Sequence, residues 1–370
     1  MKNIPSTIRK LTKKHPTPLM LISHKALDQQ YKLFKKFLPA VEPFYAIKAN
    51  PQPEIIKHFI KLGSSFDVAS GNEMMKVLEL GANPDKIIFA NTIKSEPDIK
   101  LARKKKVSLM TVDNEPELYK IAKNYPKAKI LVRIKVANVG SIVELSLKFG
   151  ADPDQATFLL KKAKALGLTP YGISFHVGSQ CINVDNYIHA LEMASAIFKE
   201  AKGEGLKLKM LDIGGGFPIR HFDADKFHFQ KMASVIKKEI KRLFPKDIKV
   251  IAEPGRFFVG PSGTLVTKVV GRTFRNNKNY YYLDDGVYGD FSGIVFDHCK
   301  YQFNTLKRGQ KFLSTLAGPT CDSFDTISQS EELPELDVSN IVYVNNIGAY
   351  SCASAVPGFN GFPTAKIVMI

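Results

Sequence analysis

Eight short apolar runs lie between residues 44 and 256, and nearly all of them carry or lead into a polar side chain suited to chemistry. The runs are FYAIK, SFDVA, KIIFAN, LMTVD, KILVRI, GISFH, MLDIGGG and VIAEPGR. Amphipathic stretches such as PEIIKHFIKLG and FQKMASVIKKEIKRLFP lie between them, with apolar residues at helical spacing. Strand and helix therefore alternate eight times, which is the pattern of a (β/α)8 barrel whose active site forms where the strands end.

The pattern changes after Gly260. GTLVTKVVGRTF, NNKN and YYYLDD predict two strands joined by a polar turn, and the strand-rich stretches QKFLSTLAGPTCD, NIVYVNNIGAY and AKIVMI follow. We therefore predict a barrel over residues 23–262 and a separate C-terminal β domain, a sandwich or small barrel, over residues 263–370. The segment PLMLIS, at residues 18–23, either joins the β domain with the rest of residues 1–22 or begins the barrel.

The composition of the chain limits the kinds of partner that it can be expected to bind. The 370-residue chain has a formal charge of +18, but the excess is scattered lysine without a stripe of arginine and aromatic residues, so we expect no nucleic-acid partner. No apolar run reaches the ~18 residues of a membrane span, and residues 1–16 lack the apolar core of a secretion signal, so we expect no membrane partner and a cytoplasmic location. Four cysteines without paired spacing predict neither a disulfide framework nor a metal site.

Lys48 ends the first run, at the carboxyl end of a predicted strand. A free lysine has a pKa of roughly 10.4 and is a poor nucleophile at neutral pH. Among apolar walls its amine loses the proton more easily and can form a Schiff base with a carbonyl group. The alternative is an ordinary surface lysine, which is common in a lysine-rich chain.

Two glycine-containing segments predict an anion site. Gly214, Gly215 and Gly216 follow the seventh run, and Gly255 and Arg256 follow the eighth. Backbone amides at glycines can approach an anion closely, arginine adds a charged fork, and barrels of this kind often bind phosphate after strands seven and eight. A tight turn is the alternative interpretation of the triple glycine.

Glu253 and His176 are two further candidate residues at the ends of the predicted barrel strands. A carboxylate facing a pyridine nitrogen keeps that nitrogen protonated, although a buried salt bridge to Arg133 or Arg256 would also explain Glu253. His176 either stacks on such a ring or is a core histidine with satisfied hydrogen bonds. A Schiff-base lysine, a phosphate site and a pyridinium partner together predict the cofactor pyridoxal 5′-phosphate (PLP).

Nine motifs, in this order along the chain, carry a resemblance to a known family. They are FYAIKAN, FDVAS, SLKFGA, ISFHVGS, LDIGGGFP, AEPGRFF, DDGVYGDFSG, GPTCDSFD and NIGAYSCA. From PLMLIS onward the chain resembles the PLP-dependent decarboxylases of basic amino acids, which combine a barrel with a β domain. Nine ordered matches are far more specific than any single motif.

The resemblance implies a role for individual residues. The implied catalytic residues are Lys48, which holds PLP covalently, His176, and Cys321 as proton donor. The implied cofactor-binding residues are Lys48, Asp67, Arg133, His176, Ser179, Gly215, Gly216, Glu253, Gly255, Arg256 and Tyr350, with Glu73 as either a further member or a helix cap. The implied contacts to the distal amine of the substrate are Asp284, Asp285 and Asp322. The implied contacts of a homodimer with shared active sites are Lys148, Asp325 and Gly348.

The resemblance also implies a reaction. DDGVYG is most similar to the ornithine pattern, so we predict decarboxylation of L-ornithine to putrescine and carbon dioxide in polyamine synthesis. Lysine, as the main substrate or beside ornithine, stays an open alternative. The two substrates differ by one methylene, which changes the binding free energy in a pocket by only ~1–3 kcal/mol. Arginine, diaminopimelate, racemisation and an inactive homologue that binds a regulatory protein are disfavoured alternatives.

Three smaller expectations accompany this reaction. Five aspartates predict a locally acidic pocket mouth for a cationic substrate: Asp284, Asp285, Asp290, Asp322 and Asp325. The segment KVANVGSIVE, at residues 135–144, corresponds to a mobile loop of the family. The sequence ends soon after the last predicted strand, so we expect no regulatory C-terminal extension.

Overall fold

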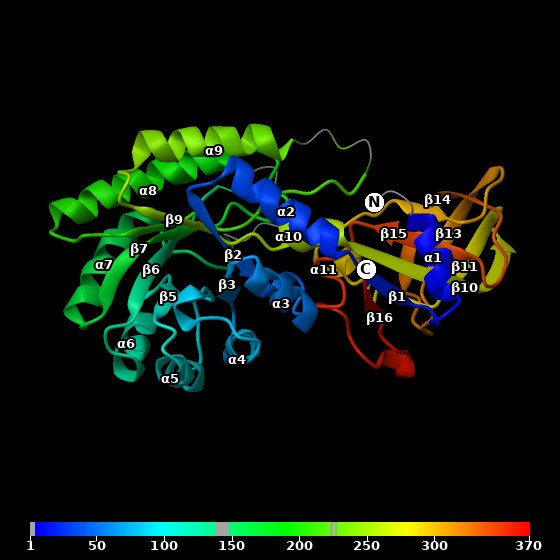
Figure 1. Ribbon diagram of the computed structural model, residues 1–370, viewed down its shortest axis with the longest axis horizontal. Helices are drawn as coiled ribbons and strands as arrows, with labels where there is room; N and C mark the ends of the chain where they lie inside the picture. The colour runs from blue at the N-terminus through cyan, green and yellow to red at the C-terminus, as the bar shows by residue number, and fades with distance from the viewer. Residues whose placement is uncertain (1–3, 138–147, 223–224, 226–227) are drawn as a thin grey trace. The chain divides into compact units, whose positions relative to one another are not determined.

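The computed structural model of the chain describes residues 4–137, 148–222, 225 and 228–370 (Figure 1). The predicted mobile loop at residues 135–144 lies largely outside the described residues. The chain forms two compact units, one of Tyr31–Pro218 with Phe227–Phe257 and one of Met1–Gln30, Ile219–Lys226 and Phe258–Ile370. We call them the barrel unit and the β unit. Among the described residues, no helix has both the length and the apolar character needed to cross a membrane.

The barrel unit contains a closed ring of parallel strands in chain order, which confirms the predicted (β/α)8 barrel. The strands are β2 (Val41–Ala46), β3 (Ser65–Val68), β4 (Ile87–Phe89), β5 (Leu109–Val112), β6 (Lys129–Ile134), β7 (Thr169–Phe175), β8 (Met210–Asp212) and β9 (Lys249–Ala252). Pairing of β2 with β9, Val41 opposite Val250, closes the ring. Each strand is short and almost wholly buried, as expected where helices cover the outside of a parallel sheet.

Helices alternate with the barrel strands along the chain, as predicted. They are α2 (His24–Phe37), α3 (Pro53–Lys61), α4 (Gly71–Glu79), α5 (Glu96–Lys105), α6 (Glu115–Asn124), α7 (Ala156–Ala165), α8 (Asp185–Gly203) and α9 (Phe229–Leu243). Ser70 caps α4, because its Oγ accepts a hydrogen bond from the backbone N–H of Glu73 at 3.2 Å. The Glu73 carboxylate accepts one from the N–H of Ala69 at 2.6 Å, so Glu73 is the capping partner rather than a free acid.

Apolar side chains fill the inside of the barrel. Phe44, Ile88, Leu109, Leu131, Met210 and Ile251, from six of the strands, form one buried cluster. Each such side chain contributes ~1.5–3 kcal/mol by leaving water. The filled interior leaves chemistry to the strand ends and the loops that follow them.

The β unit is built on an eight-stranded sheet with the path β12-β15-β10-β11-β13-β14. Its strands are β1 (Leu19–Ile22), β10 (Gly263–Arg275), β11 (Lys278–Leu283), β12 (Phe303–Thr305), β13 (Lys311–Ala317), β14 (Thr326–Pro334), β15 (Ile341–Asn345) and β16 (Lys366–Met369). Short helices complete the two units: α1 (Ile4–Thr12), α10 (Arg256–Val259) and α11 (Gly293–Phe296). The predicted C-terminal β domain is confirmed, and β1 within PLMLIS belongs to its sheet, pairing with β10 and β16.

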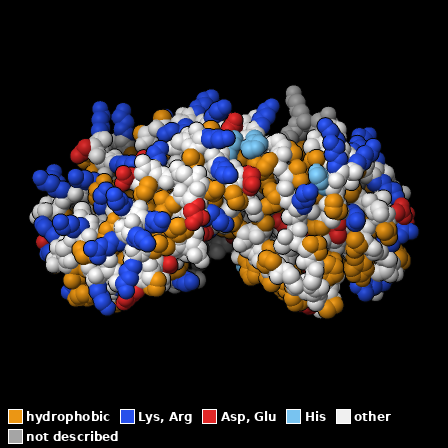
Figure 2. All heavy atoms as spheres, turned by 60° about the horizontal axis from the view of Figure 1, so that its bottom comes forward, with side chains coloured by type: hydrophobic (Ala, Val, Ile, Leu, Met, Phe, Trp, Pro, Cys, Tyr) orange, Lys and Arg blue, Asp and Glu red, His pale blue; other side chains and the backbone are white. Residues whose placement is uncertain are grey.

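The predicted hairpin lies at β10 and β11. Asn276 and Asn277 form its two-residue turn with φ angles of +53° and +56°, the left-handed pair that matches the twist of two antiparallel strands. Lysine and arginine side chains are dispersed over the face seen in Figure 2 rather than gathered into a stripe. The high positive charge is therefore spread out on this face.

Candidate active site

Lys48 lies at the end of the first barrel strand, in the single turn Ile47–Ala49 that follows β2. Its Nζ is 2.5 Å from Oδ2 of Asp67, which lies in the neighbouring strand β3. The Lys48 side chain is 43% exposed, whereas that of Asp67 is 1% exposed. The buried carboxylate therefore holds the amine at the mouth of the barrel, and the amine stays reachable by a reactant.

His176 follows β7 and presents a neutral ring. Its Nδ1 accepts a hydrogen bond from the backbone N–H of Gly178 at 3.0 Å, which places the ring proton on Nε2. Burial, with the positive charges of Arg133 and Lys48, holds the pKa of His176 well below 6.5. The hydrogen bond from Gly178 fixes the orientation of this neutral, flat ring. Such a ring is suited to packing against another ring.

Glu253 and Asp212 are two buried carboxyl groups that influence each other's pKa. Asp212 ends β8 and also accepts hydrogen bonds from Ser174 Oγ at 3.1 Å and from the backbone N–H of Gly214 at 2.8 Å. Burial, with the neighbouring acids, raises the pKa of Glu253 well above 4.5, and burial raises that of Asp212 to about 6. Both acids therefore hold a proton more strongly than exposed carboxyl groups do.

Asp212 is absent from the predicted site residues. The LDIGGG motif points first to its glycines, although an acid at the end of a buried strand is itself a signal of a functional position.

Arg133, in β6, balances the charge of this region. Burial lowers its pKa, and Glu253, Asp113, Asp212 and Asp67 oppose that shift.

The triple glycine packs too closely for any side chain. A Cβ atom on Gly215 would lie 2.6 Å from the carbonyl oxygen of Glu253 and 3.1 Å from Nε2 of His176. Gly216 has φ +93°, and its Cβ would lie 2.3 Å from the carbonyl oxygen of Gly178, next to Ser179. Because these positions are glycine, the backbone can lie in contact with Glu253 and His176. Backbone amides exposed in this way can bind an anion.

Arg256 is the second element of the predicted anion site. It follows Gly255 after β9, begins the short helix α10, and is buried with 5% of its surface exposed. Tyr187, on α8, supports the glycine segment because its Oη donates a hydrogen bond to the carbonyl oxygen of Gly215 at 2.8 Å.

These residues fit PLP. Lys48 offers an amine held at the barrel mouth, and the glycine segment offers close backbone for a phosphate. Glu253 Oε1 is buried and has no hydrogen-bond partner within the described part of the chain, so it can accept a hydrogen bond from a ring nitrogen. In this arrangement Glu253 would hold the ring nitrogen, Arg133 would balance the acids, and His176 would lie against the ring.

Comparison with known proteins identifies the class that this fold and site define. Residues 24–260 match the family model of the pyridoxal-dependent decarboxylases, pyridoxal binding domain. The chain belongs to this family of PLP-dependent decarboxylases of basic amino acids, and its cofactor is PLP.

Two curated relatives and one solved structure show how far the similarity extends. The chain is 41% identical over 362 residues to a lysine/ornithine decarboxylase of Selenomonas ruminantium, covering 98% of this chain and 92% of the relative. It is 39% identical over 347 residues to an ornithine decarboxylase of Schizosaccharomyces pombe, covering 90% of this chain and 78% of the relative. The solved structure of SrLDC in complex with PLP and cadaverine has a TM-score of 0.95 and 39% identity, covering 100% of this chain and 94% of that chain.

The remaining predicted site residues belong to the β unit. Cys321 is exposed on the loop between β13 and β14, and its backbone N–H donates to Oδ1 of Asn360 at 3.1 Å. The neighbouring Asp322 accepts a short hydrogen bond from Oη of Tyr288, whose ring stacks on Phe359 at 4.1 Å between centroids. The hydrogen bond from Tyr288 keeps the pKa of Asp322 below its usual value, so Asp322 is a carboxylate.

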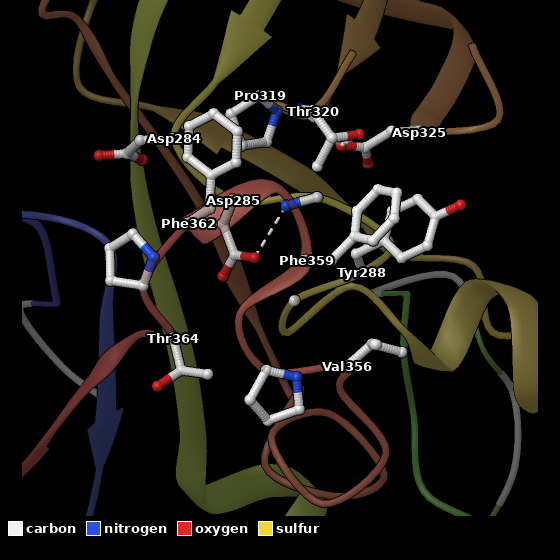
Figure 3. A pocket seen from close by; sticks show the side chains of 14 residues that line it. Asp284, Asp285, Tyr288, Pro319, Thr320, Asp325, Val356, Phe359, Phe362 and Thr364 are labelled. Carbon is white, nitrogen blue, oxygen red and sulfur yellow. Dashed lines mark hydrogen bonds between the residues drawn. The ribbon is translucent and has the colours of Figure 1, made fainter. Parts of the chain in front are cut away.

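Asp284 and Asp285 are adjacent in sequence but differ in surroundings. Asp284 accepts hydrogen bonds from Thr17 Oγ1 at 2.5 Å and from the backbone N–H of Lys268 at 2.9 Å, so both of its oxygens are engaged within the β unit. The Asp285 carboxyl instead turns into a pocket walled by Tyr288, Phe359 and Phe362, as Figure 3 shows. This geometry favours Asp285 over Asp284 as the group that meets a ligand.

The residues predicted at a dimer interface have intrachain contacts of their own. Asp325 is buried and accepts hydrogen bonds from the N–H of Val287 at 2.8 Å and from the N–H and hydroxyl of Thr320 at 3.1 and 2.8 Å. A Cβ on Gly348 would lie 2.1 Å from the carbonyl oxygen of Val259. Lys148 is exposed, with Nζ 5.0 Å from the ring centroid of Phe149. Tyr350 has a left-handed backbone, φ +51°.

Proposed function

We propose that the protein decarboxylates L-ornithine to putrescine and carbon dioxide, supplying polyamine synthesis. The observation that carries this proposal is the Asp285 pocket. A buried carboxyl oxygen beside aromatic walls suits the ammonium group at the far end of a diamino acid, and it would repel the second carboxylate of diaminopimelate. Relatives that carry the name ornithine decarboxylase support the same substrate class.

Lysine is the second candidate substrate, because a relative that covers nearly the whole chain is named a lysine/ornithine decarboxylase. Lysine is longer by one methylene, and a pocket discriminates such a difference by only ~1–3 kcal/mol. Small changes in the pocket walls are therefore enough to decide which of the two substrates the enzyme prefers.

Each site residue has a task in this reaction. PLP supplies the ring that accepts the electrons left behind when carbon dioxide departs. Lys48 would hold the aldehyde group of the cofactor, Glu253 would keep a proton at the ring nitrogen, and His176 would pack against the ring. The thiol of Cys321 donates the proton that the α-carbon needs after carbon dioxide has left.

We further propose a homodimer in which active sites are shared, as the family resemblance implies. Asp285, Cys321 and Asp322 of one subunit would act with the barrel of the partner, and Lys148, Asp325 and Gly348 would lie at the interface. Mixing Lys48→Ala and Cys321→Ala subunits, each of them impaired on its own, tests this arrangement. Random exchange places both intact halves in about a quarter of the sites, so about a quarter of the wild-type activity should return.

Side-by-side turnover with ornithine, lysine, arginine and diaminopimelate tests the reaction itself. We expect release of carbon dioxide from ornithine, with lysine slower or comparable, and little from diaminopimelate. Turnover of diaminopimelate alone, or of none of the four, would overturn the proposal. A cytoplasmic location is proposed on the same footing and is tested by cell fractionation.

A further inference from the structure

Each carbonyl group of the triple glycine accepts a hydrogen bond from a donor within the barrel unit. The donors to Gly214, Gly215 and Gly216 are, in this order, the backbone N–H of Glu253 at 2.7 Å, Oη of Tyr187 at 2.8 Å and the backbone N–H of Cys181 at 2.9 Å. Two of the donors are backbone groups, which a substitution leaves in place. The hydroxyl of Tyr187 is the side-chain donor, and it is absent from the predicted site residues.

The hydrogen bond from Tyr187 also fixes the direction of the next N–H group. The peptide bonds of the glycine segment are trans, and in a planar trans peptide the C=O and the N–H point in opposite directions. Because Tyr187 holds the carbonyl of Gly215, the N–H of Gly216 is directed away from Tyr187. This N–H has no hydrogen-bond partner within the described residues, so it is available to a ligand.

Packing holds the Tyr187 ring in place on α8. The residue is fully buried, and its ring stacks on that of Phe217 with 5.6 Å between centroids and 22° between the ring planes. Phe217 directly follows the triple glycine, so Tyr187 contacts this segment through both its ring and its hydroxyl. A buried tyrosine hydroxyl needs a hydrogen-bond partner, which keeps Oη on the carbonyl oxygen of Gly215.

We propose that Tyr187 is a positioning residue for the cofactor phosphate: it holds the carbonyl of Gly215 so that the N–H of Gly216 donates to a phosphate oxygen. Hydrogen bonds to a charged oxygen are about twice as strong as those between neutral groups. An N–H that is already turned toward its acceptor avoids the cost of ordering the backbone when PLP binds. The inference concerns the cofactor, so it is independent of which amino acid the enzyme decarboxylates.

Tyr187→Phe removes the hydroxyl and keeps the ring that stacks on Phe217. Cofactor-free protein is titrated with PLP and, separately, with pyridoxal, which has the same ring and aldehyde but no phosphate. Circular dichroism of the bound cofactor follows each titration, because it reports cofactor held in a fixed site rather than on scattered surface lysines. Tyr281→Phe is the matched control: Tyr281 is also buried, and its Oη accepts a hydrogen bond from the backbone N–H of Leu336 in the β unit.

In Tyr187→Phe we expect the dissociation constant for PLP to rise about three- to tenfold, the effect of losing one ordinary hydrogen bond. The dissociation constant for pyridoxal should change by less than about twofold, because pyridoxal has no phosphate for the N–H of Gly216 to bind. In Tyr281→Phe both constants should stay close to those of the wild type. An equal loss for PLP and pyridoxal would reduce Tyr187 to a structural role and overturn the inference, as would an unchanged affinity for PLP.

Phosphorus NMR of the PLP-loaded proteins gives a second readout, on the phosphate itself. The phosphorus resonance should move in Tyr187→Phe, because the hydrogen bonding around the phosphate changes, and should keep its wild-type position in Tyr281→Phe. Melting temperatures of the cofactor-free variants should decrease by similar small amounts, since each variant loses one buried hydrogen bond. A phosphorus resonance that stays at the wild-type position in Tyr187→Phe would contradict the inference even if the affinity for PLP falls.

Discussion

Lys48 and Asp67 are joined across neighbouring strands of the barrel, with Nζ of the lysine 2.5 Å from Oδ2 of the aspartate. One partner is exposed and the other is buried, so the pair projects a single amine from an otherwise filled barrel. The buried acid keeps the amine in place, and the position at the strand end gives it access to a cofactor.

Replacing Lys48 by alanine should abolish the visible absorbance of the lysine-bound cofactor and reduce turnover by on the order of 10³-fold or more. The physical reason is that, among the described residues, Lys48 supplies the amine that Asp67 holds at this position. Absorbance spectra of purified protein incubated with PLP measure the effect. Lys100→Ala, on the exposed face of α5, is the matched control and should keep the wild-type spectrum. A wild-type spectrum in Lys48→Ala would refute the assignment.

The acid pair Glu253 and Asp212 predicts a pH dependence of stability in the cofactor-free protein. Both pKa values are raised on folding, so the stability is fully present below about pH 4 and is lost as pH rises through the folded values, about 6 for Asp212. In Asp212→Asn this loss should be smaller by ~1–3 kcal/mol between pH 5 and pH 8. Chemical unfolding at several pH values measures it, with the exposed Asp154→Asn as control. Equal pH profiles for Asp212→Asn and wild type would contradict the raised pKa of Asp212.

Gly216→Ala should weaken PLP binding by at least tenfold, because the added Cβ would lie 2.3 Å from the carbonyl oxygen of Gly178 and must displace backbone. Gly205→Ala is a close control, since Gly205 also has a positive φ, +71°, but open space around its Cβ position. Titration of cofactor-free protein with PLP compares the two. Both variants should lose ~1–2 kcal/mol of stability from the left-handed backbone, and Gly216→Ala alone should lose affinity.

Cys321→Ala should slow decarboxylation or place the proton on the cofactor carbon instead of the α-carbon. The second outcome gives abortive transamination, which appears as an aldehyde product and a loss of activity during turnover. Product analysis by mass spectrometry separates the two products. Cys352→Ala, which removes another thiol of the β unit, should behave as wild type. Normal products and rate in Cys321→Ala would remove its role as proton donor.

Salt should have little effect on the apparent affinity for the cationic substrate. The net charge of +18 would oppose substrate approach, but Asp285 and Asp322 lie close to the proposed binding position and act over short distances. Michaelis constants measured between low and moderate ionic strength should change by less than about threefold. A sharp improvement with salt would show that long-range repulsion dominates.

The fold could be predicted because two different hydrophobic periods appear along the chain. Strand runs followed by helices define the barrel, and Asn276–Asn277 between two apolar runs predicts the hairpin that the structure shows. The sequence could not predict which unit contains β1, because a short buried run fits either sheet. Its pairing with β10 and β16 places it in the sheet of the β unit.

The chemistry of individual side chains was less accessible from sequence. No sequence motif singles out Lys94, yet it is buried and donates hydrogen bonds to the carbonyl oxygens of Asn91 and Thr111, both at 2.6 Å. Burial lowers its pKa to about 7. Asp212 was likewise missed, because its partner Glu253 lies on the next strand and no local pattern links the two.

The pairing of β1 with β16 brings residues 19–22 beside residues 366–369. A ribosome releases all eight barrel strands before it releases β16, so the barrel can close while this sheet still lacks one of its members. Assembly of the β unit must then wait until β16 has been synthesised, and a chain cut short before β16 would leave β1 with one exposed edge.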